Sequence, residues 1–225
     1  MRNGIPRNQL LSFPTSLVAV LGHEDDEIIG SGGTLAKNIR LGGKSHVICA
    51  GGKREKELED ACGILGVSYD VLGLEHDSYR MNLFDKVPYI KESIIERKPS
   101  FVITHRAEGD YHLDHGATYD VAKLAATKAQ FPAHGWNTYG LLLTETHSPH
   151  HIWHMMVDVS KDYDKVFSAF NVHSSQMEKN DFYYKKLCDA RTKFRGVQAG
   201  CERAEAFVFE PLSIVGSMNK RNLGA

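Results

Sequence analysis

The sequence predicts a doubly wound α/β fold, with a mostly parallel sheet and helices on both faces. Three observations indicate this fold. Short apolar runs alternate with segments of helical period through the first two thirds of the 225-residue chain. Glycines and a proline stand where these segments should end. The composition, with 42% hydrophobic and 24% charged residues, is that of a globular protein. Such alternation is typical of parallel strands joined by right-handed crossovers.

The apolar runs predict five strands in the first two thirds of the chain, at Leu17–Leu21, His46–Ala50, Tyr69–Leu74, Phe101–Thr104 and Tyr139–Thr144. The segments between them predict helices at Thr34–Leu41, Glu55–Leu65, Lys86–Arg97 and Ala117–Ala129. The less regular last third predicts strands at Ile152–Val159 and Ala206–Phe209, and helices at Asp162–Asn171 and Asp181–Gly196. No linker or repeat divides the chain, so we expect one domain over residues 1–225, with its core at about 16–210 and a loose tail at 217–225.

Charge and composition argue against several classes of function. The net charge is −1 and the basic residues are scattered, so electrostatics gives no support for nucleic-acid binding. No apolar run approaches the ~20 residues of a membrane span, and the apolar patch near the start, Leu10–Phe13, is too short for a signal peptide. The four cysteines lack any motif spacing and are expected to be free thiols. We therefore expect a cytoplasmic protein without nucleic-acid or membrane partners.

An acidic cluster follows the first predicted strand. Residues His23–Glu27 place a histidine and four successive carboxylates ahead of the glycine-rich turn Gly30–Gly33. Four adjacent carboxylates repel one another and resist burial, and a divalent cation would offset that cost. The alternative is that they only favour the N-terminus of the next helix through its dipole. The turn does not fit a dinucleotide site, because it lacks the G-x-G-x-x-G spacing and follows acidic residues.

A second polar cluster, Asp110–His115, follows the fourth predicted strand. In a doubly wound sheet the first and fourth strands are commonly neighbours, and ligands bind at the carboxyl ends of the strands. The two clusters are therefore expected to face each other across one crevice. His23, Asp26 and His115 are the types of ligand that a catalytic zinc ion takes, with a fourth position open to water.

The other polar residues of the two clusters suit acid–base work. Zinc lowers the pKa of its bound water to about 7, and Asp25 could then remove the proton. His112 could protonate a leaving group or hold an oxyanion, while Asp114 accepts from its other ring nitrogen. The clusters together predict metal-assisted hydrolysis of a carbonyl bond. A third histidine-rich run, His147–His154, does not match common zinc spacings and is predicted to be a loop with edge-strand histidines.

These motifs resemble those of a known family. The run His23–Glu27, followed by Gly32–Ala36, is similar to the AHPDDE…GGTLA opening of the PIG-L/LmbE-like zinc-dependent N-deacetylases, of the N-acetylglucosaminyl deacetylase type. The second cluster resembles the family's D-x-H-x-D-H motif. Further matches are Lys165, Ala169 and His173–Gln176 to its K…A…H-x-S-Q segment, and Ala204–Phe207 to its closing A-E-x-F. The resemblance runs from Leu17 to Phe209, and Glu24 stands where the family usually has proline.

The resemblance implies a Rossmann-like fold of the LmbE type and a set of site residues. It implies that His23, Asp26 and His115 bind Zn²⁺, with other divalent metals as alternatives. Asp25 would be the general base, and His112, paired with Asp114, would stabilise the oxyanion and act as acid. Arg54 matches an arginine that contacts substrate or braces the site, and Asp77 matches an acidic residue that often faces the sugar.

The activity implied by the resemblance is removal of an N-acetyl group from an amino sugar or its conjugate. Metal-bound water, activated by Asp25, would attack the amide carbonyl, and the metal and His112 would hold the oxyanion. The alternatives are an amidase for a longer acyl chain or a thiol–sugar conjugate, and a metal-binding homologue without turnover. The expected partner is a small-molecule N-acetylated amino sugar, and the resemblance leaves a homo-oligomer open.

Overall fold

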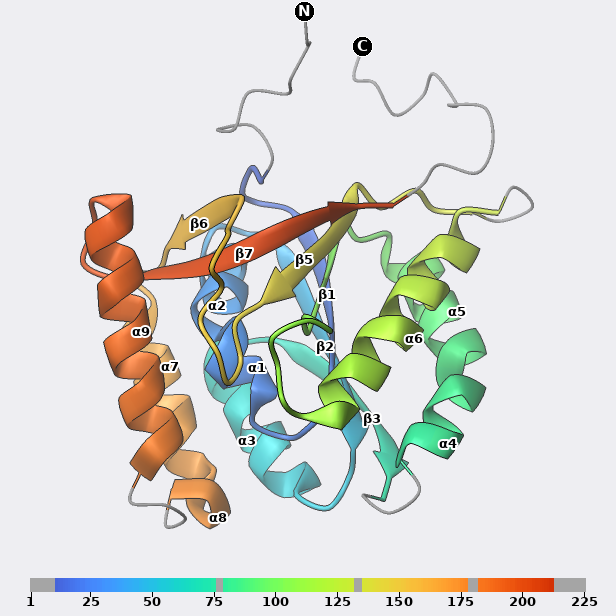
Figure 1. Ribbon diagram of the computed structural model, residues 1–225, viewed down its shortest axis with the longest axis horizontal. Coiled ribbons are helices and arrows are strands. Elements are labelled where there is room, and N and C mark those ends of the chain that lie inside the picture. The colour runs from blue at the N-terminus through green and yellow to red at the C-terminus, as the bar shows by residue number, and fades with distance from the viewer. Residues whose placement is uncertain (1–10, 76–78, 132–134, 178–181, 213–225) are drawn as a thin grey trace, which may run out of the picture.

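A single sheet of seven described strands lies between two layers of helices (Figure 1). The computed structural model describes residues 11–75, 79–131, 135–177 and 182–212. The strands are β1 (Ser16–Leu21), β2 (Lys44–Gly51), β3 (Ser68–Leu74), β4 (Phe101–Thr104), β5 (Gly140–Thr144), β6 (Met155–Asp158) and β7 (Ala204–Pro211). Their order across the sheet is β3-β2-β1-β4-β5-β7-β6.

The pairing of the strands confirms the doubly wound, mostly parallel sheet. Strands β1 to β5 are parallel to one another, whereas β7 runs antiparallel to both β5 and β6. The first and fourth strands are neighbours, as expected, and pair from Leu17↔Phe101 to Ala19↔Ile103. The reversed direction of β7 is a feature that an apolar pattern alone does not indicate. Because β1 and β4 are parallel, the residues that follow them meet at one edge of the sheet.

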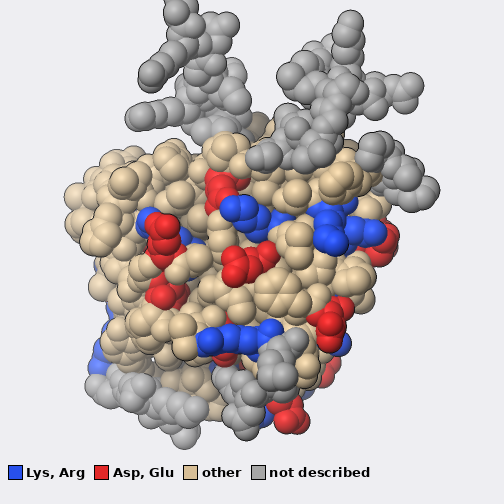
Figure 2. Space-filling model, turned by 45° about the vertical axis from the view of Figure 1, so that its right-hand side comes forward, with Lys and Arg blue, Asp and Glu red and all other residues tan. Residues whose placement is uncertain are grey.

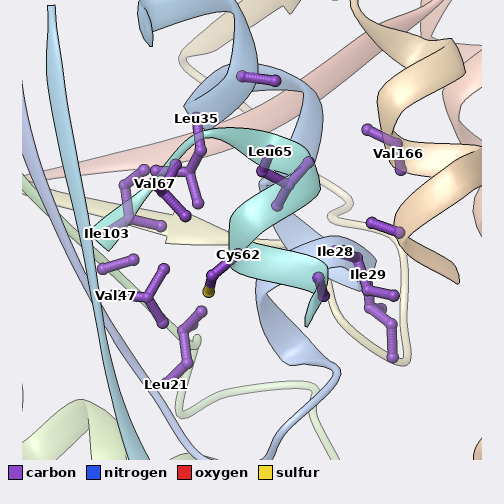
Figure 3. Close-up of a cluster of buried hydrophobic side chains, with 14 of the residues drawn as sticks. Leu21, Ile28, Ile29, Leu35, Val47, Cys62, Leu65, Val67, Ile103 and Val166 are labelled. Carbon is purple, nitrogen blue, oxygen red and sulfur yellow. The ribbon is translucent and has the colours of Figure 1, made fainter. Parts of the chain in front are cut away.

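Strand β1 runs through the middle of the sheet and is buried on both faces. Leu17, Ala19 and Leu21 pack into one core and Val18 and Val20 into the other, as the alternation along a strand requires. The first core, part of which is drawn in Figure 3, lies under α2 (Gly32–Arg40), α3 (Glu55–Leu65), α7 (Tyr163–Val172) and α9 (Tyr183–Ala199). The second lies under α5 (Val87–Arg97) and α6 (Leu113–Ala129), on the right of Figure 1. Such a fully apolar strand is typical of a parallel sheet covered on both faces.

Three short helices in the described residues were not predicted from the sequence: α1 (Asp26–Gly30), α4 (Tyr79–Leu83) and α8 (Ser174–Met177). Each has at most five residues, too few for a helical period to show. A 3₁₀ turn, Phe84–Lys86, leads into α5. The predicted tail at 217–225 and the predicted helix start at Asp181 lie outside the described residues. None of the described helices has the length and apolarity needed to cross a membrane.

A buried asparagine fastens α2 to the beginnings of β1 and β2. The Asn38 side chain is buried, accepts a hydrogen bond from the Thr15 N–H at 2.9 Å, and donates to the carbonyls of Thr15 and Lys44 at 3.0 and 2.9 Å. Its amide nitrogen also lies 3.0 Å from Ser45 Oγ. This network holds the helix that follows the acidic cluster against the sheet.

Asn38→Ala is expected to lower the free energy of unfolding by about 2–4 kcal/mol, because it removes a buried side chain together with its hydrogen bonds to the backbone of Thr15 and Lys44. Urea unfolding followed by circular dichroism measures this loss. Asn171→Ala is the matched control, because Asn171 is exposed and accepts only from Lys185 Nζ among the described residues. Asn171→Ala should lower the free energy of unfolding by less than about 0.5 kcal/mol. Equal losses in the two variants would contradict this role of Asn38.

Candidate metal centre

The two polar clusters meet where β1 and β4 end. Strand β1 stops at Leu21, Gly22 follows, and α1 begins at Asp26. A Cβ atom on Gly22 would lie 3.2 Å from the His115 ring and 3.3 Å from both Asp26 Oδ2 and Tyr79 Oη. A glycine at this position therefore lets the backbone of the first cluster approach the second cluster closely.

Three side chains turn ligand-type atoms toward one another. His23 Nδ1 lies 3.2 Å from His115 Nε2, and Asp26 Oδ2 lies 3.4 Å from each of these nitrogens. A tetrahedral zinc ion with bonds of about 2.0–2.1 Å needs ligand atoms about 3.3–3.4 Å apart. The three atoms, which we call the ligand triangle, thus have the spacing of one face of such a tetrahedron. The residues present fit a zinc ion.

The outer nitrogen of each imidazole in the ligand triangle faces a carboxylate. His115 Nδ1 lies 2.7 Å from Asp110 Oδ2, and His23 Nε2 lies 3.2 Å from Asp114 Oδ2. Such pairs fix the ring orientation and the tautomer of metal-binding histidines. Asp26 is fixed as well, because its Oδ2 accepts the backbone N–H of His23 at 2.7 Å. All three corners of the triangle are therefore oriented by other groups of the protein.

His105, directly after β4, supports the triangle as a neutral ring. Its Nε2 accepts the Gly22 N–H at 2.9 Å, and its Nδ1 lies 3.0 Å from Thr146 Oγ1. Because Nε2 is an acceptor, the ring proton is on Nδ1. Burial and the neighbouring His115 lower the pKa of His105 to about 4. His105 therefore anchors the Gly22 turn, while its Nε2 lies 3.3 Å from Asp26 Oδ2.

Without a cation, the carboxylates draw protons onto the histidines of the triangle. Burial would lower the pKa of His115, but Asp26 and Asp110 outweigh it and raise that pKa to about 10. Burial also opposes protonation of His23, yet Asp26 raises its pKa. Burial would raise the pKa of Asp26, but the charge of the His115 imidazole outweighs it and holds the pKa of Asp26 well below its usual range. A metal ion at the triangle therefore competes with protons.

Asp25 lies next to the triangle in sequence and is held by an arginine. Arg54 precedes α3, and its Nη1 and Nη2 lie 3.4 and 3.3 Å from the two carboxylate oxygens of Asp25. The same Nη2 lies 3.3 Å from Glu24 Oε2. Asp25, Glu24 and Arg54 line one cavity together with His23 and Asp26. The structure thus pairs Arg54 with Asp25.

His112 and Asp114 are not paired as the sequence predicts. The Asp114 carboxylate lies 3.8 Å from His112 Nδ1, beyond hydrogen-bond reach, and 3.2 Å from His23 Nε2 instead. His112 caps the N-terminus of α6, and its Nδ1 accepts the Asp114 backbone N–H at 3.3 Å, which leaves the ring proton on Nε2. Burial and the charges of His23 and His115 lower the pKa of His112 to about 4. His112 is thus a neutral donor in the cavity wall.

The triangle opens into a cavity of about 430 Å³. Besides the residues above, its wall includes Lys53, Leu74, Tyr79, Ser175, Gln176 and Tyr184. Segments far apart in the sequence therefore build one pocket, from the ends of β1, β2 and β3 to α8 and α9. Asp77, the other residue predicted to face substrate, lies outside the described residues.

His147 lies in a loop, as predicted, and it also lines this cavity, a part in the site that the sequence analysis did not assign to it. Its Nδ1 lies 3.1 Å from Asp110 Oδ1, and its ring stacks on that of His115 with centroids 4.9 Å apart. The sequence did carry a signal, because His147 follows the predicted strand that pairs with β4. Two other histidines of the His147–His154 run contact backbone groups. His150 Nε2 lies 3.0 Å from the Leu143 carbonyl, and His154 Nδ1 accepts the Phe209 N–H.

Comparison with known proteins agrees with this arrangement. The family model described as PIG-L: GlcNAc-PI de-N-acetylase matches residues 18–126. This segment belongs to the PIG-L family. It runs from within β1 to the last turn of α6, and it includes all three residues of the ligand triangle. No curated protein matches the chain.

Several solved structures share the fold of this chain. The conserved protein TT1542 from Thermus thermophilus has a TM-score of 0.77 and 22% identity, covering 91% of this chain and 99% of that one. The N,N'-diacetylchitobiose deacetylase from Pyrococcus horikoshii has a TM-score of 0.70 and 21% identity, over 88% and 84%. GalB, the 4-carboxy-2-hydroxymuconate hydratase from Pseudomonas putida, has a TM-score of 0.72 and 19% identity, over 91% and 99%. These likenesses concern the fold, which carries more than one chemistry.

Metal binding by the ligand triangle is expected to release at least one proton at pH 7, because the pKa of His115 is about 10 in the metal-free protein and Nε2 must lose its proton to bind. Calorimetric titration with Zn²⁺ in buffers of different ionisation enthalpy measures this number. His147→Ala is the control, since it removes a neighbouring ring but leaves the triangle intact, and it should release the same number. A binding heat that does not depend on the buffer would mean that no proton is released, and it would contradict the assignment of His115 as a metal ligand.

Proposed function

We propose that the chain is a zinc-dependent N-deacetylase that removes an N-acetyl group from an amino sugar or its conjugate. The observation that carries this proposal is the ligand triangle of His23, Asp26 and His115, with its edges of 3.2–3.4 Å. Two imidazoles and one carboxylate with an open fourth position are typical of catalytic zinc. The PIG-L match and the fold shared with a deacetylase support the choice of reaction.

Asp25 is the proposed general base. Bound zinc supplies a water of lowered pKa and a Lewis acid for the amide carbonyl. The Asp25 carboxylate lines the cavity next to the triangle, and the fork of Arg54 limits its rotation. In this position it accepts the proton of the attacking water and can return it to the amine that leaves.

His112 is the proposed partner of the oxyanion. Its pKa of about 4 keeps the ring neutral at pH 7, and its Nδ1 is occupied by the Asp114 N–H, which leaves Nε2–H as the donor. A donor fixed in the cavity wall stabilises the negative charge that develops on the carbonyl oxygen. In the metal-free protein, burial and the charges of His23 and His115 favour the neutral, donating form of His112 over the acid form that the resemblance also implies. We therefore assign proton return to Asp25.

A small amino-sugar substrate suits the cavity. Its volume of about 430 Å³ falls in the usual range of small-molecule sites, and its wall offers the aromatic rings of Tyr79 and Tyr184 beside the polar Ser175 and Gln176. Acidic and basic side chains are interspersed on the face shown in Figure 2, which supports a small-molecule partner over nucleic acid. We also propose a cytoplasmic location, supported by the buried free thiols of Cys49, Cys62 and Cys188.

Two neighbouring aspartates should respond differently to substitution. Asp25→Asn is expected to lower kcat for acetate release about 10²–10⁴-fold while the metal content stays at that of the wild type, because only the base is lost. Asp26→Ala is expected to lose the metal, because one corner of the triangle is gone. Metal analysis and acetate release from N-acetylglucosamine derivatives measure both. The opposite pattern would reverse the two assignments.

The same assay separates the proposal from its alternatives. Release of a longer acyl chain in preference to acetate would indicate the amidase. Metal bound at full stoichiometry without hydrolysis of any amide in the panel would indicate a binding protein or a different reaction, such as that of the hydratase that shares the fold. A correctly folded wild type that holds no metal would contradict the proposed function itself.

A further inference from the structure

Glu24 is a buried carboxylate at the site to which the proposed mechanism gives no task. The residue is 3% exposed, in the wall of the cavity. A Cβ atom on Gly51 would lie 3.0–3.2 Å from the carboxyl group of Glu24, so this group lies directly against the backbone at the end of β2. Burying a charged carboxylate is costly unless it is paired and hydrogen-bonded. Its position therefore depends on a partner.

That partner is Arg54, which Glu24 contacts twice. Glu24 Oε1 accepts the backbone N–H of Arg54 at 3.0 Å, and Oε2 lies 3.3 Å from Arg54 Nη2. The first contact fixes the residue from which α3 starts, and the second fixes its guanidinium. Because Gly51 leaves room for the carboxylate and Arg54 holds both of its oxygens, Glu24 has little freedom to move.

The guanidinium of Arg54 is shared between two carboxylates. Its Nη1 and Nη2 lie 3.4 and 3.3 Å from Asp25, and the same Nη2 lies 3.3 Å from Glu24. An arginine that serves one carboxylate alone usually forms bonds of about 2.7–2.9 Å. The longer distances indicate that Glu24 and Asp25 draw the guanidinium in different directions. The place of the Asp25 carboxylate therefore depends on both of its neighbours.

We propose that Glu24 is a positioning residue, which holds Arg54 away from a closer pairing with Asp25 and thereby keeps the Asp25 carboxylate aimed at the reacting water. This inference rests on the proposed function, in which Asp25 is the base. Without Glu24, the guanidinium and the Asp25 carboxylate approach each other by about half an ångström, the difference between the present distances and those of an unshared pair, and the carboxylate leaves its present position. Small misplacements of a reacting group are enough to slow catalysis strongly.

The test compares Glu24→Ala with the wild type in two ways. In crystal structures, the Arg54–Asp25 distances should shorten toward about 2.8 Å in the variant. In kinetics, the kcat of the variant should fall about 10–100-fold, the usual loss when a residue that orients a reacting group is removed. Its KM should stay within about twofold of the wild-type value, and its metal content should not change. Gly51→Ala pushes on the Glu24 carboxylate without removing it, and a smaller loss of kcat is expected there.

Two further variants show whether Glu24 acts through Arg54. If it does, adding Glu24→Ala to Arg54→Ala should cost no further activity, because the effects of residues acting through one group are not additive. Asp162→Ala is the matched control. Asp162 is also a buried carboxylate paired with an arginine, Arg40, at 2.7 Å, but it does not line the cavity. Its substitution should therefore leave kcat unchanged.

Unchanged Arg54–Asp25 distances in Glu24→Ala would overturn the inference, whatever the activity. Equal kcat in Glu24→Ala and wild type, or multiplying losses in the double variant, would overturn it as well. A wild type that hydrolyses no amide would instead refute the proposed function, and the crystal structures would still decide whether Glu24 sets the position of Asp25.

Discussion

The structure depends on one electrostatic constraint, the burial of four successive carboxylates at the end of β1. Glu24, Asp25, Asp26 and Glu27 are all less than 10% exposed. Unpaired, they would repel one another and resist leaving water. Each has at least one partner from a distant part of the chain. Arg54 serves the first two, His105 and His115 lie beside the third together with the nearby His23, and His173 Nε2 lies 2.9 Å from Glu27 Oε1. The fold is what brings these partners together.

The sheet makes this pairing possible through the order of its strands. Because β4 lies next to β1, His105 and His115 arrive at the same edge as Asp26, and because β2 lies on the other side, Arg54 arrives beside Glu24 and Asp25. The pairing divides the acidic cluster into parts with separate tasks. Asp26 faces imidazoles, which suits a shared metal ion, whereas Asp25 faces a guanidinium, which orients it without occupying a ligand position.

Most of the fold was predictable because its signals are local. A buried parallel strand such as β1 shows as an uninterrupted apolar run, and the adjacency of β1 and β4 follows from the usual order of a doubly wound sheet. The short helices α1, α4 and α8 were missed, since so few residues show no period. The direction of β7 depends on its path back to β5, which no local pattern encodes.

The sequence was a better guide to which residues form the candidate site than to which of them contact one another. Composition and strand order suffice to bring His23, Asp26 and His115 together, but the rotamer of Asp114, which turns to His23 and not to His112, depends on the three-dimensional surroundings. His147 was missed because histidine runs alone are weak signals. Its place after β5, beside β4, was the better guide.

The central claim is that the ligand triangle holds a metal ion. A crystal structure of the purified protein, with anomalous scattering measured at the zinc edge, tests it most directly. The account predicts one peak within about 2.0–2.2 Å of His23 Nδ1, Asp26 Oδ2 and His115 Nε2. Its absence from a zinc-loaded protein, or a peak held by Asp110 and His147 with the triangle empty, would contradict the account.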